Sequence, residues 1–221
     1  SDRQWALNNV GQSAGEPGVD INILGGWDIL ANTPGVPSIP EGVTVAVIDE
    51  GVDLNHRDLN LVEGYDATGQ GSEGGANPWD AHGTACAGII GAKKNNMGIV
   101  GVAPDVKIMP VRIAYSPEPE DRHWVTTDAQ IADGILWAAT HGARVLSNSY
   151  GGGRRSGIMD RALKTARDMG CTFVFASGNN NDPTVSYPGR SDKVIAVGAL
   201  DPCGERKNPD GCDGAPWGSS Y

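Results

Sequence analysis

Short apolar runs rich in β-branched residues alternate along this chain with segments of helical periodicity. Runs of this kind are typical of strands that are buried on both faces, as in a parallel sheet. Because parallel neighbours need a crossover connection, the alternation predicts an α/β fold with a mostly parallel, twisted sheet and helices on both faces, in three layers. The predicted strands are Val43 to Ile48, Val106 to Ile113, Arg144 to Ser149, Thr172 to Ser177 and Val194 to Leu200.

Two segments between these runs have the periodicity of amphipathic helices. The first spans Asp128 to His141, and the second follows Gly157; Gly142 and Gly170 stand where the two helices are expected to end. The apolar face of the first helix consists of Ile131, Ile135, Leu136 and Ala139, and that of the second of Ile158, Ala162, Leu163, Ala166 and Met169. Surface loops are expected from Gly69 to Pro78 and from Tyr115 to Trp124.

Length and charge limit the function classes. The chain has 221 residues, enough for one α/β domain with a large core, and a formal net charge of -10. With no basic patch to displace counterions we expect no nucleic-acid partner, and the acidity favours solubility. No apolar run reaches the roughly 18 residues of a membrane span, so we expect no membrane partner. No glycine-rich phosphate loop follows the first strand, which disfavours a nucleotide-binding domain.

Four cysteines leave the redox compartment open. Cys203 and Cys212 bracket a loop rich in Gly, Pro and Asp, where a local disulfide and two free thiols are equal alternatives. Cys86 lies in an apolar helical run and is expected to be a buried free thiol. Cys171 directly precedes a strand and fits either state.

Three polar residues stand at strand ends or a helix start, where open α/β sheets carry their chemistry. Asp49 ends an apolar strand, so its carboxylate can orient a histidine; the alternative is a turn or N-cap aspartate. His82 opens a helical run, whose positive end is expected to lower its pKa and keep it available as a base; the alternative is a capping role. Asn179 follows a strand and can donate to an oxyanion; the alternative is a turn asparagine.

These residues belong to a longer ordered set of motifs. The set comprises Ile48-Asp49-Glu50-Gly51, His82-Gly83-Thr84-Ala85-Cys86-Ala87-Gly88, Gly101-Val102-Ala103-Pro104, Ser177-Gly178-Asn179 and Ser186-Tyr187-Pro188-Gly189. In motif and in spacing it resembles the subtilase family of serine proteases, from about Gln4 to Tyr221. The opening Gln4 to Asn9 and the segment Asp20-Ile21-Asn22 are similar to the N-terminal segment of kexin-like and many bacterial subtilases.

The resemblance implies a serine endopeptidase with a subtilisin-like fold. Asp49 would be the triad aspartate, His82 the general base and Asn179 the oxyanion donor. Ser149, Tyr150 and Gly151 would pair with the substrate backbone and form one wall of the main specificity pocket.

Specificity is left open by two features. Glu50 stands where kexin-like enzymes also carry an acid, which favours basic residues near the cleaved bond. The segment Tyr150 to Arg155 has no acid where those enzymes place one, so large apolar side chains fit the pocket equally well.

The resemblance also implies a structural Ca²⁺ ion. Asp58 would give a carboxylate and Asn95 a side-chain oxygen, while Lys93, Met97 and Ile99 would give backbone carbonyls. An all-oxygen ligand set of this kind suits a hard cation; the alternative is an ordinary Asn-rich turn.

The sequence departs from the family in one respect, because it contains no Gly-Thr-Ser nucleophile motif followed by a helix. Gly218-Ser219-Ser220-Tyr221 instead resembles a turn that precedes the nucleophile in the family. We expect residues 1–221 to be the N-terminal major part of one catalytic domain, with the serine either on a C-terminal piece that is cleaved near Tyr221 and stays bound, or on a portion removed by truncation. The alternative is a catalytically inactive subtilase-fold binding or scaffold protein.

The expected partners are protein or peptide substrates, the chain's own C-terminal fragment, and a pro-segment or inhibitor. By the resemblance, the expected location is secreted, extracellular or periplasmic.

Overall fold

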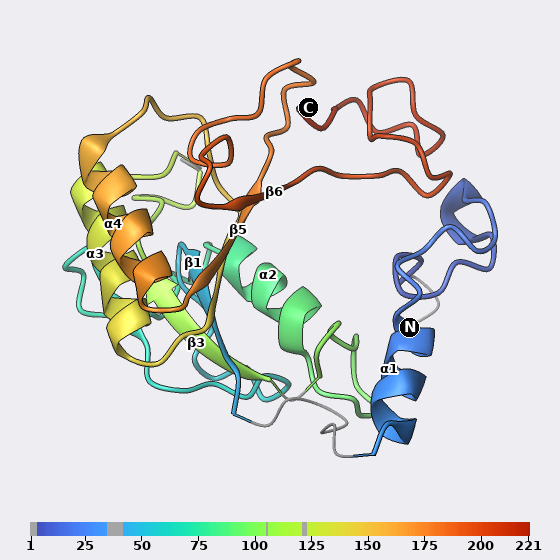
Figure 1. Ribbon diagram of the computed structural model, residues 1–221, viewed down its shortest axis with the longest axis horizontal. Helices are drawn as coiled ribbons and strands as arrows, with labels where there is room; N and C mark the ends of the chain where they lie inside the picture. The colour runs from blue at the N-terminus through green and yellow to red at the C-terminus, as the bar shows by residue number, and fades with distance from the viewer. Residues whose placement is uncertain (1–3, 35–41, 105, 121–122) are drawn as a thin grey trace.

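The computed structural model describes residues 4–34, 42–104, 106–120 and 123–221, and its centre is a parallel sheet of six strands (Figure 1). Their order across the sheet is β2-β3-β1-β4-β5-β6, and every pairing is parallel. The predicted α/β class is therefore confirmed. The strands are β1 (Thr44–Asp49), β2 (Tyr65–Asp66), β3 (Lys107–Arg112), β4 (Val145–Asn148), β5 (Thr172–Ala176) and β6 (Ile195–Val197).

Helices cover both faces of this sheet, as predicted. Alternate residues of β1 point to opposite faces: Ala46 and Ile48 pack with α3 and α4, while Val45 and Val47 pack with Ala87 of α2. Figure 1 shows the same division, with α3 and α4 together on one side of the strands and α2 on the other. The helices are η1 (Gln12–Ala14), α1 (Ile23–Asn32), α2 (His82–Gly91), α3 (Asp128–Thr140) and α4 (Gly157–Asp168).

The order of the strands reverses direction at β1. The chain passes from β1 to β3 on one side, through α2, and then to β4 on the other side, through α3. In open α/β sheets, ligands bind outside the carboxyl ends of the strands at such a switch point. Asp49 is the last residue of β1, so the topology alone places it where a site is expected.

Some elements differ from the sequence-based predictions. Helix α1 was not expected, because Gly25 and Gly26 weaken its helical pattern. Ile158 and Met169 were predicted to belong to the apolar face of the second helix but are 39% and 41% exposed, since Ile158 lies in the first turn of α4 and Met169 follows its last residue. The loop predicted from Tyr115 to Trp124 lies in part outside the described residues, at positions 121–122.

The cysteine alternatives are resolved. Cys203 and Cys212 form a disulfide, whereas Cys171 is a buried free thiol whose Sγ donates to the carbonyl of Ala143. Cys86 is also free, but the prediction that it is buried was wrong: it is partly exposed, although its side chain packs against the core between α2 and the sheet.

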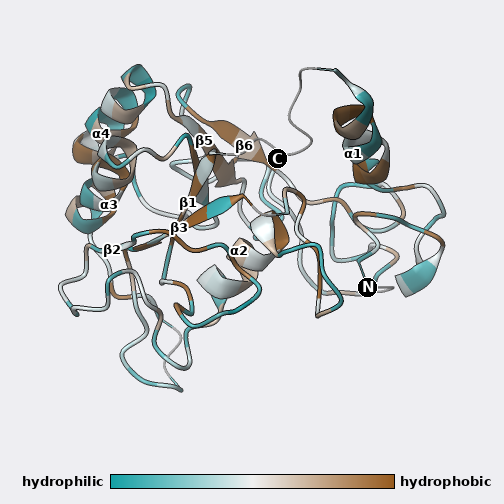
Figure 2. Cartoon of the chain, turned by 90° about the horizontal axis from the view of Figure 1, so that it is seen from below, coloured by the Kyte–Doolittle hydropathy of each residue, from teal (hydrophilic) through white to brown (hydrophobic). Residues whose placement is uncertain are grey.

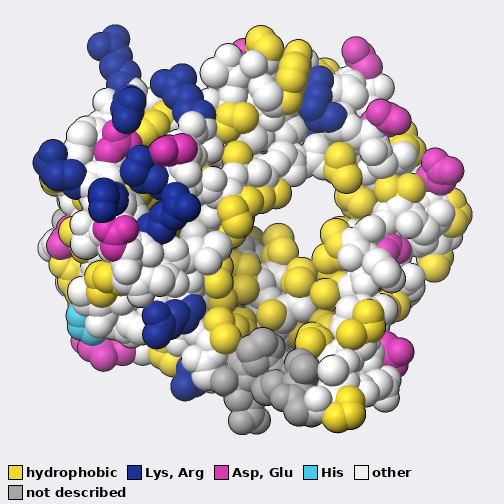
Figure 3. All heavy atoms as spheres, in the orientation of Figure 1, with side chains coloured by type: hydrophobic (Ala, Val, Ile, Leu, Met, Phe, Trp, Pro, Cys, Tyr) yellow, Lys and Arg dark blue, Asp and Glu magenta, His cyan; other side chains and the backbone are white. Residues whose placement is uncertain are grey.

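An apolar surface surrounds a hollow in the molecule. Strand β6 pairs only with β5 in the described sheet, and its Ile195 and Val197 are 55% and 49% exposed. Ile89 of α2 is 61% exposed. Figure 2 colours β5 and β6 brown, and Figure 3 shows hydrophobic side chains around the hollow. In the described ranges, no helix has the length and apolar character needed to cross a membrane.

Candidate active site

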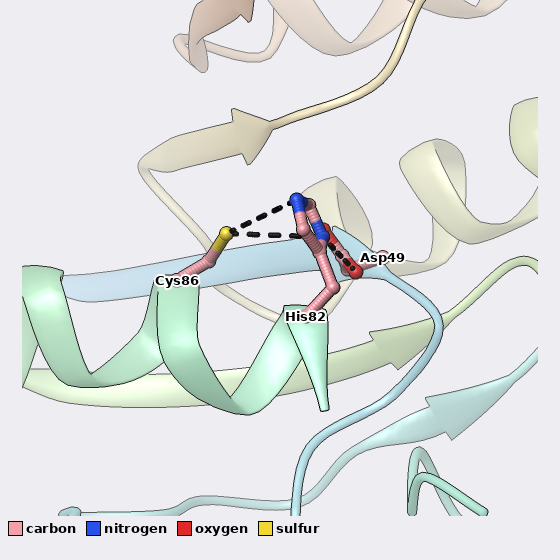
Figure 4. A group of neighbouring side chains, drawn as sticks. All are labelled: Asp49, His82 and Cys86. Carbon is pink, nitrogen blue, oxygen red and sulfur yellow. Dashed lines mark hydrogen bonds and ion pairs between the residues drawn. The ribbon is translucent and has the colours of Figure 1, made fainter. Parts of the chain in front are cut away.

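The carboxylate of Asp49 and the imidazole of His82 are in direct contact. Asp49 has no exposed surface, and its Oδ1 accepts the backbone N–H of Glu50 at 2.9 Å. Nδ1 of His82 lies 2.9 Å and 3.0 Å from the two oxygens of Asp49 (Figure 4). The His82 side chain is 49% exposed, so one edge of the ring is held by a buried carboxylate while the rest remains accessible.

Gly83 allows α2 to approach the end of β1 this closely. A Cβ atom at this position would overlap the carbonyl oxygen of Gly51 and lie 3.1 Å from Cβ of Asp49. Only glycine fits between the first turn of the helix and the strand end. The contact between Asp49 and His82 therefore depends on this residue.

We expect Gly83→Ala to lower the free energy of unfolding by about 1–3 kcal/mol, because the added methyl group overpacks the contact. Gly88→Ala is the matched control, since it lies in the same helix and its Cβ would have only a 3.4 Å contact with the flexible end of Ile99. Denaturant unfolding of both variants measures the difference. Equal stabilities would contradict this role of Gly83.

The pKa of His82 is raised above its ordinary value of 6.5, chiefly by the hydrogen bond to Asp49 and then by that to Cys86. The expectation that the helix N-terminus lowers this pKa was wrong, because a carboxylate in contact outweighs the partial charge of a helix end. A group whose folded pKa is raised contributes stability fully below pH 6.5, and this contribution is lost as pH rises through the raised pKa.

We expect Asp49→Asn to lower the His82 pKa by about 1–3 pH units, because the amide cannot stabilise the imidazolium. NMR titration of the ring protons of His82 in both proteins measures the change. His141 serves as an internal control, since its Nδ1 is 2.8 Å from the carbonyl of Trp137 and its ring stacks on the Trp137 ring. An unchanged His82 pKa would show that Asp49 does not determine it.

Glu50 was predicted to bind substrate, but its carboxylate is already engaged. One oxygen accepts the backbone N–H of His82 at 2.7 Å, and the other accepts the indole N–H of Trp124 at 2.7 Å. The residue is only 5% exposed, and burial is the main cause of its raised pKa. Glu50 therefore holds the start of α2 and the Trp124 ring in place, and its role in binding substrate stays a prediction.

A cleft of about 680 Å³ lies next to the exposed part of His82. Trp124 borders it and meets the His82 ring edge-on, with the ring centroids 6.0 Å apart. The predicted substrate-binding residues Ser149, Tyr150 and Gly151 also border this cleft, directly after β4. The structure thus brings them to the same cleft as His82.

The hydroxyl of Tyr150 donates to Oδ1 of Asn148 at 2.9 Å, and its ring packs edge-on against Phe175. These contacts fix the segment that follows β4.

Strand β5 ends at Ala176 and is followed by Ser177 and Gly178, whose φ of 113° makes a sharp turn. Asn179 comes directly after this turn. Asn179 is exposed, and its side chain makes no hydrogen bond with the other described residues. The asparagine is thus at the carboxyl edge of the sheet, with its amide free to contact a ligand.

Two of the predicted calcium residues, Asp58 and Asn95, are in direct contact. Asp58 is buried, and its Oδ1 accepts from the Asn95 amide at 2.6 Å. The lysine charges point elsewhere, since Nζ of Lys93 donates to the Arg57 carbonyl and Nζ of Lys94 lies 5.2 Å from the centroid of Trp27.

The predicted calcium ligands also include three backbone carbonyls. Among the described residues, the carbonyls of Lys93, Met97 and Ile99 accept no hydrogen bond, so their oxygens are free to bind a cation. The Asn95 amide would have to turn its oxygen toward Asp58, because that oxygen now accepts the N–H of Met97. With that rotation, the donor set fits Ca²⁺.

Neither serine near the end of the chain is placed as a nucleophile. Ser219 and Ser220 are 1% and 2% exposed. The Ser219 hydroxyl lies 3.1 Å from that of Ser177, and the backbone N–H of Ser220 donates to Gly178. Within the described residues, the ring of His82 has hydrogen-bond contacts only with Asp49 and Cys86.

The chain matches the sequence profile of the subtilase family over residues 40–211. It is similar to "Fervidolysin" of Fervidobacterium pennivorans, with 40% identity over 212 residues that cover 90% of this chain and 29% of the relative. It is also similar to "Thermophilic serine proteinase" of Bacillus sp. (strain AK1), with 37% identity covering 79% of this chain and 41% of the relative. Subtilisin BL of Lederbergia lenta is 35% identical over 72% of this chain and 56% of the relative.

The chain therefore belongs to the subtilase family of peptidases. It spans between 29% and 56% of the length of these three relatives.

Sequence reasoning missed Trp124 and the position of Cys86. No local signal marks Trp124, which reaches the site through its bond to Glu50. The position of Cys86 beside His82 could have been predicted, because residues i and i+4 of a helix share a face and His82 is four residues earlier.

Proposed function

We propose that this chain supplies two of the three triad residues of a serine endopeptidase, Asp49 and His82. The observation that carries the proposal is the contact of a fully buried carboxylate with Nδ1 of a histidine whose ring borders an open cleft. Membership of the subtilase family supports the same assignment. The nucleophilic serine is proposed to lie on a C-terminal portion beyond residue 221.

In this mechanism His82 accepts the proton of the serine hydroxyl as the serine attacks the peptide carbonyl. Asp49 orients the imidazole through Nδ1 and stabilises the imidazolium that forms. Asn179 donates its amide N–H to the oxygen of the tetrahedral intermediate, where negative charge develops. Ser149, Tyr150 and Gly151 align the substrate backbone beside the cleft as an added strand.

The apolar surface around the hollow supports a further portion of the domain. Ile195 and Val197 on β6 and Ile89 on α2 are each about half exposed or more. Monomeric proteins rarely leave contiguous apolar surface uncovered, and an unpaired strand edge is a liability. We propose that the C-terminal portion packs into the hollow and places its serine near His82.

We propose that Ca²⁺ binds at the cluster formed by Asp58, Asn95 and the carbonyls of Lys93, Met97 and Ile99. The ion would tie the loop after α2 to the segment after β1, which supplies Asp58.

We expect Ca²⁺ at 100 times its Kd to raise the free energy of unfolding by about 2.7 kcal/mol, because it binds only the folded state. Asp58→Asn removes the carboxylate and should abolish most of this gain, whereas Asn96→Ala should keep it, since Asn96 supplies none of the proposed ligands. Thermal unfolding with and without Ca²⁺ tests this. An equal gain in the wild type and Asp58→Asn would exclude the cluster.

The substrates are proposed to be proteins or peptides, with a pro-segment or inhibitor as a further partner. A secreted, extracellular or periplasmic location is proposed, and the Cys203–Cys212 disulfide supports it because such bonds persist in oxidising compartments.

The second candidate is a catalytically inactive scaffold of the same fold. The two are separated by incubating the protein that carries the C-terminal continuation with a serine-directed phosphonate and with a peptide substrate. Hydrolysis of the peptide together with covalent labelling supports the peptidase. A folded protein that neither labels nor cleaves peptides supports the scaffold.

A further inference from the structure

The loop that carries Asn179 is held on both sides by a segment near the end of the chain. Before the asparagine, the carbonyl of Gly178 accepts the backbone N–H of Ser220 at 2.9 Å. After it, the backbone N–H of Asn181 donates to the carbonyl of Gly218 at 2.8 Å. Figure 1 shows the end of the chain, marked C, beside the orange loop that follows β5. Asn179 therefore lies between two backbone contacts with one neighbouring segment, residues 218–221.

Arg206 joins the same loop and segment through its side chain. Its Nη1 donates to Oδ1 of Asn181 at 2.7 Å and to the carbonyl of Ser219 at 2.6 Å. Its guanidinium carbon lies 4.3 Å from the centroid of the Tyr221 ring, which is a cation–π contact. A planar guanidinium can stack on a ring and donate hydrogen bonds in its own plane at the same time, whereas a lysine ammonium is only a point charge.

The backbone of Arg206 is itself fixed. It forms an antiparallel bridge with Leu200, and the Cys203–Cys212 disulfide closes the loop in which it lies. Oδ1 of the buried Asp201 accepts the backbone N–H of Cys203 at 3.0 Å at the start of this loop. The guanidinium therefore extends from an anchored loop toward the turn that carries Asn179.

We propose that Arg206 is a positioning residue for Asn179. By fixing Asn181 and the 218–221 segment, it would hold the turn in the orientation that directs the Asn179 amide at the oxyanion. The Asn179 side chain makes no hydrogen bond with the other described residues, so its direction depends on its backbone. A misplacement of about 1 Å in a catalytic group can cost about 10²-fold in rate. The inference rests on the proposed function, in which Asn179 donates to the tetrahedral intermediate.

The positioning role is tested with Arg206→Met, which removes the donors but keeps an unbranched side chain. Steady-state kinetics with a peptide substrate are measured on the protein with its C-terminal continuation. We expect kcat to fall about 10–100-fold while KM stays within about twofold of the wild type. Arg161→Met is the matched control, since Arg161 is an exposed arginine on α4, and it should keep the wild-type kcat.

Asn181→Ala removes the acceptor of one Arg206 hydrogen bond and should lower kcat in the same way, but less, because the bond to Ser219 remains. Asn181 is exposed, so this variant still tests the proposal if Arg206→Met does not fold. Thermal unfolding shows which variants are folded at the assay temperature. Wild-type kcat in folded Arg206→Met, or in folded Asn181→Ala where Arg206→Met does not fold, would overturn the positioning role.

A double-mutant cycle separates positioning from a general effect on the fold. If Arg206 acts through Asn179, adding Arg206→Met to Asn179→Ala should lower kcat by less than about threefold more. A residue that only stabilised the fold would cause the same fractional loss in both backgrounds. A double variant whose loss equals the product of the two single losses would therefore overturn the proposal.

Hydrogen exchange tests the structural part without any activity. In Arg206→Met, we expect the backbone N–H groups of Asn181 and Ser220 to exchange about tenfold faster, with no change in β1. Unchanged exchange at both positions would show that Arg206 does not hold the turn. Wild-type kcat in Arg206→Met beside a lowered kcat in Asn179→Ala would overturn the positioning role and leave the proposed function standing. A wild-type protein without peptidase activity would refute the proposed function, and the positioning role with it.

Discussion

Asp49→Asn is expected to reduce the kcat of the assembled peptidase by about 10⁴-fold while KM stays near the wild-type value. The substitution keeps the shape of the side chain but removes its charge. Asparagine would then favour the wrong tautomer of His82, because its amide can donate to Nδ1 and leave Nε2 protonated. The lost stabilisation applies mainly to the transition state, where the imidazolium forms, so kcat rather than KM carries the effect.

Steady-state kinetics with a peptide substrate measures this loss. Asp53→Asn is the matched control, since Asp53 is an exposed aspartate in the next turn whose Oδ1 accepts only the N–H of Asn55. Activity of Asp49→Asn within tenfold of the wild type would contradict the triad assignment.

Asn179→Ala is expected to lower kcat by about 10²–10³-fold, a figure taken from the corresponding asparagine of subtilisin, with little change in KM. The side chain is exposed at the carboxyl edge of the sheet and makes no hydrogen bond among the described residues, so its removal should leave the fold intact. The loss would arise because the oxyanion of the tetrahedral intermediate loses a donor.

Asn180→Ala is the control for this variant, because it changes the next asparagine, whose bridge to Gly218 is made by the backbone. Circular dichroism and thermal unfolding should show that both variants are folded. A parallel rise in KM for Asn179→Ala would indicate that the residue binds the ground state instead of the oxyanion.

The sequence was sufficient for the central strands and for the pairing of Asp49 with His82, but β2 (Tyr65–Asp66) was not predicted, and β6 was predicted to be buried although it is exposed. Both residues stand at element boundaries, and parallel topology gathers the carboxyl ends of strands at one edge of the sheet. The parallel topology therefore places the carboxyl end of β1 and the start of α2 at the same edge of the sheet.

Three features of the site depended on tertiary packing and were not predictable locally. The raised pKa of His82 is caused chiefly by the Asp49 carboxylate 2.9 Å from its Nδ1. The position of His82 at a helix start does not predict this contact. Glu50 was expected to bind substrate, but its carboxylate accepts hydrogen bonds from His82 and Trp124, which are 32 and 74 positions away along the chain. The partial exposure of Cys86 depends on how α2 packs on the sheet, because Ala87 and Gly88 are buried there whereas Cys86 is covered only in part.

The central claim is the proposal that His82 acts as the general base for a serine located beyond residue 221. The most direct test is peptide mapping of the protein with its C-terminal continuation after reaction with a serine-directed phosphonate. The account predicts a single labelled serine in the continuation, and no label in His82→Ala. Label on Ser219 or Ser220, or labelling that survives the loss of His82, would contradict it.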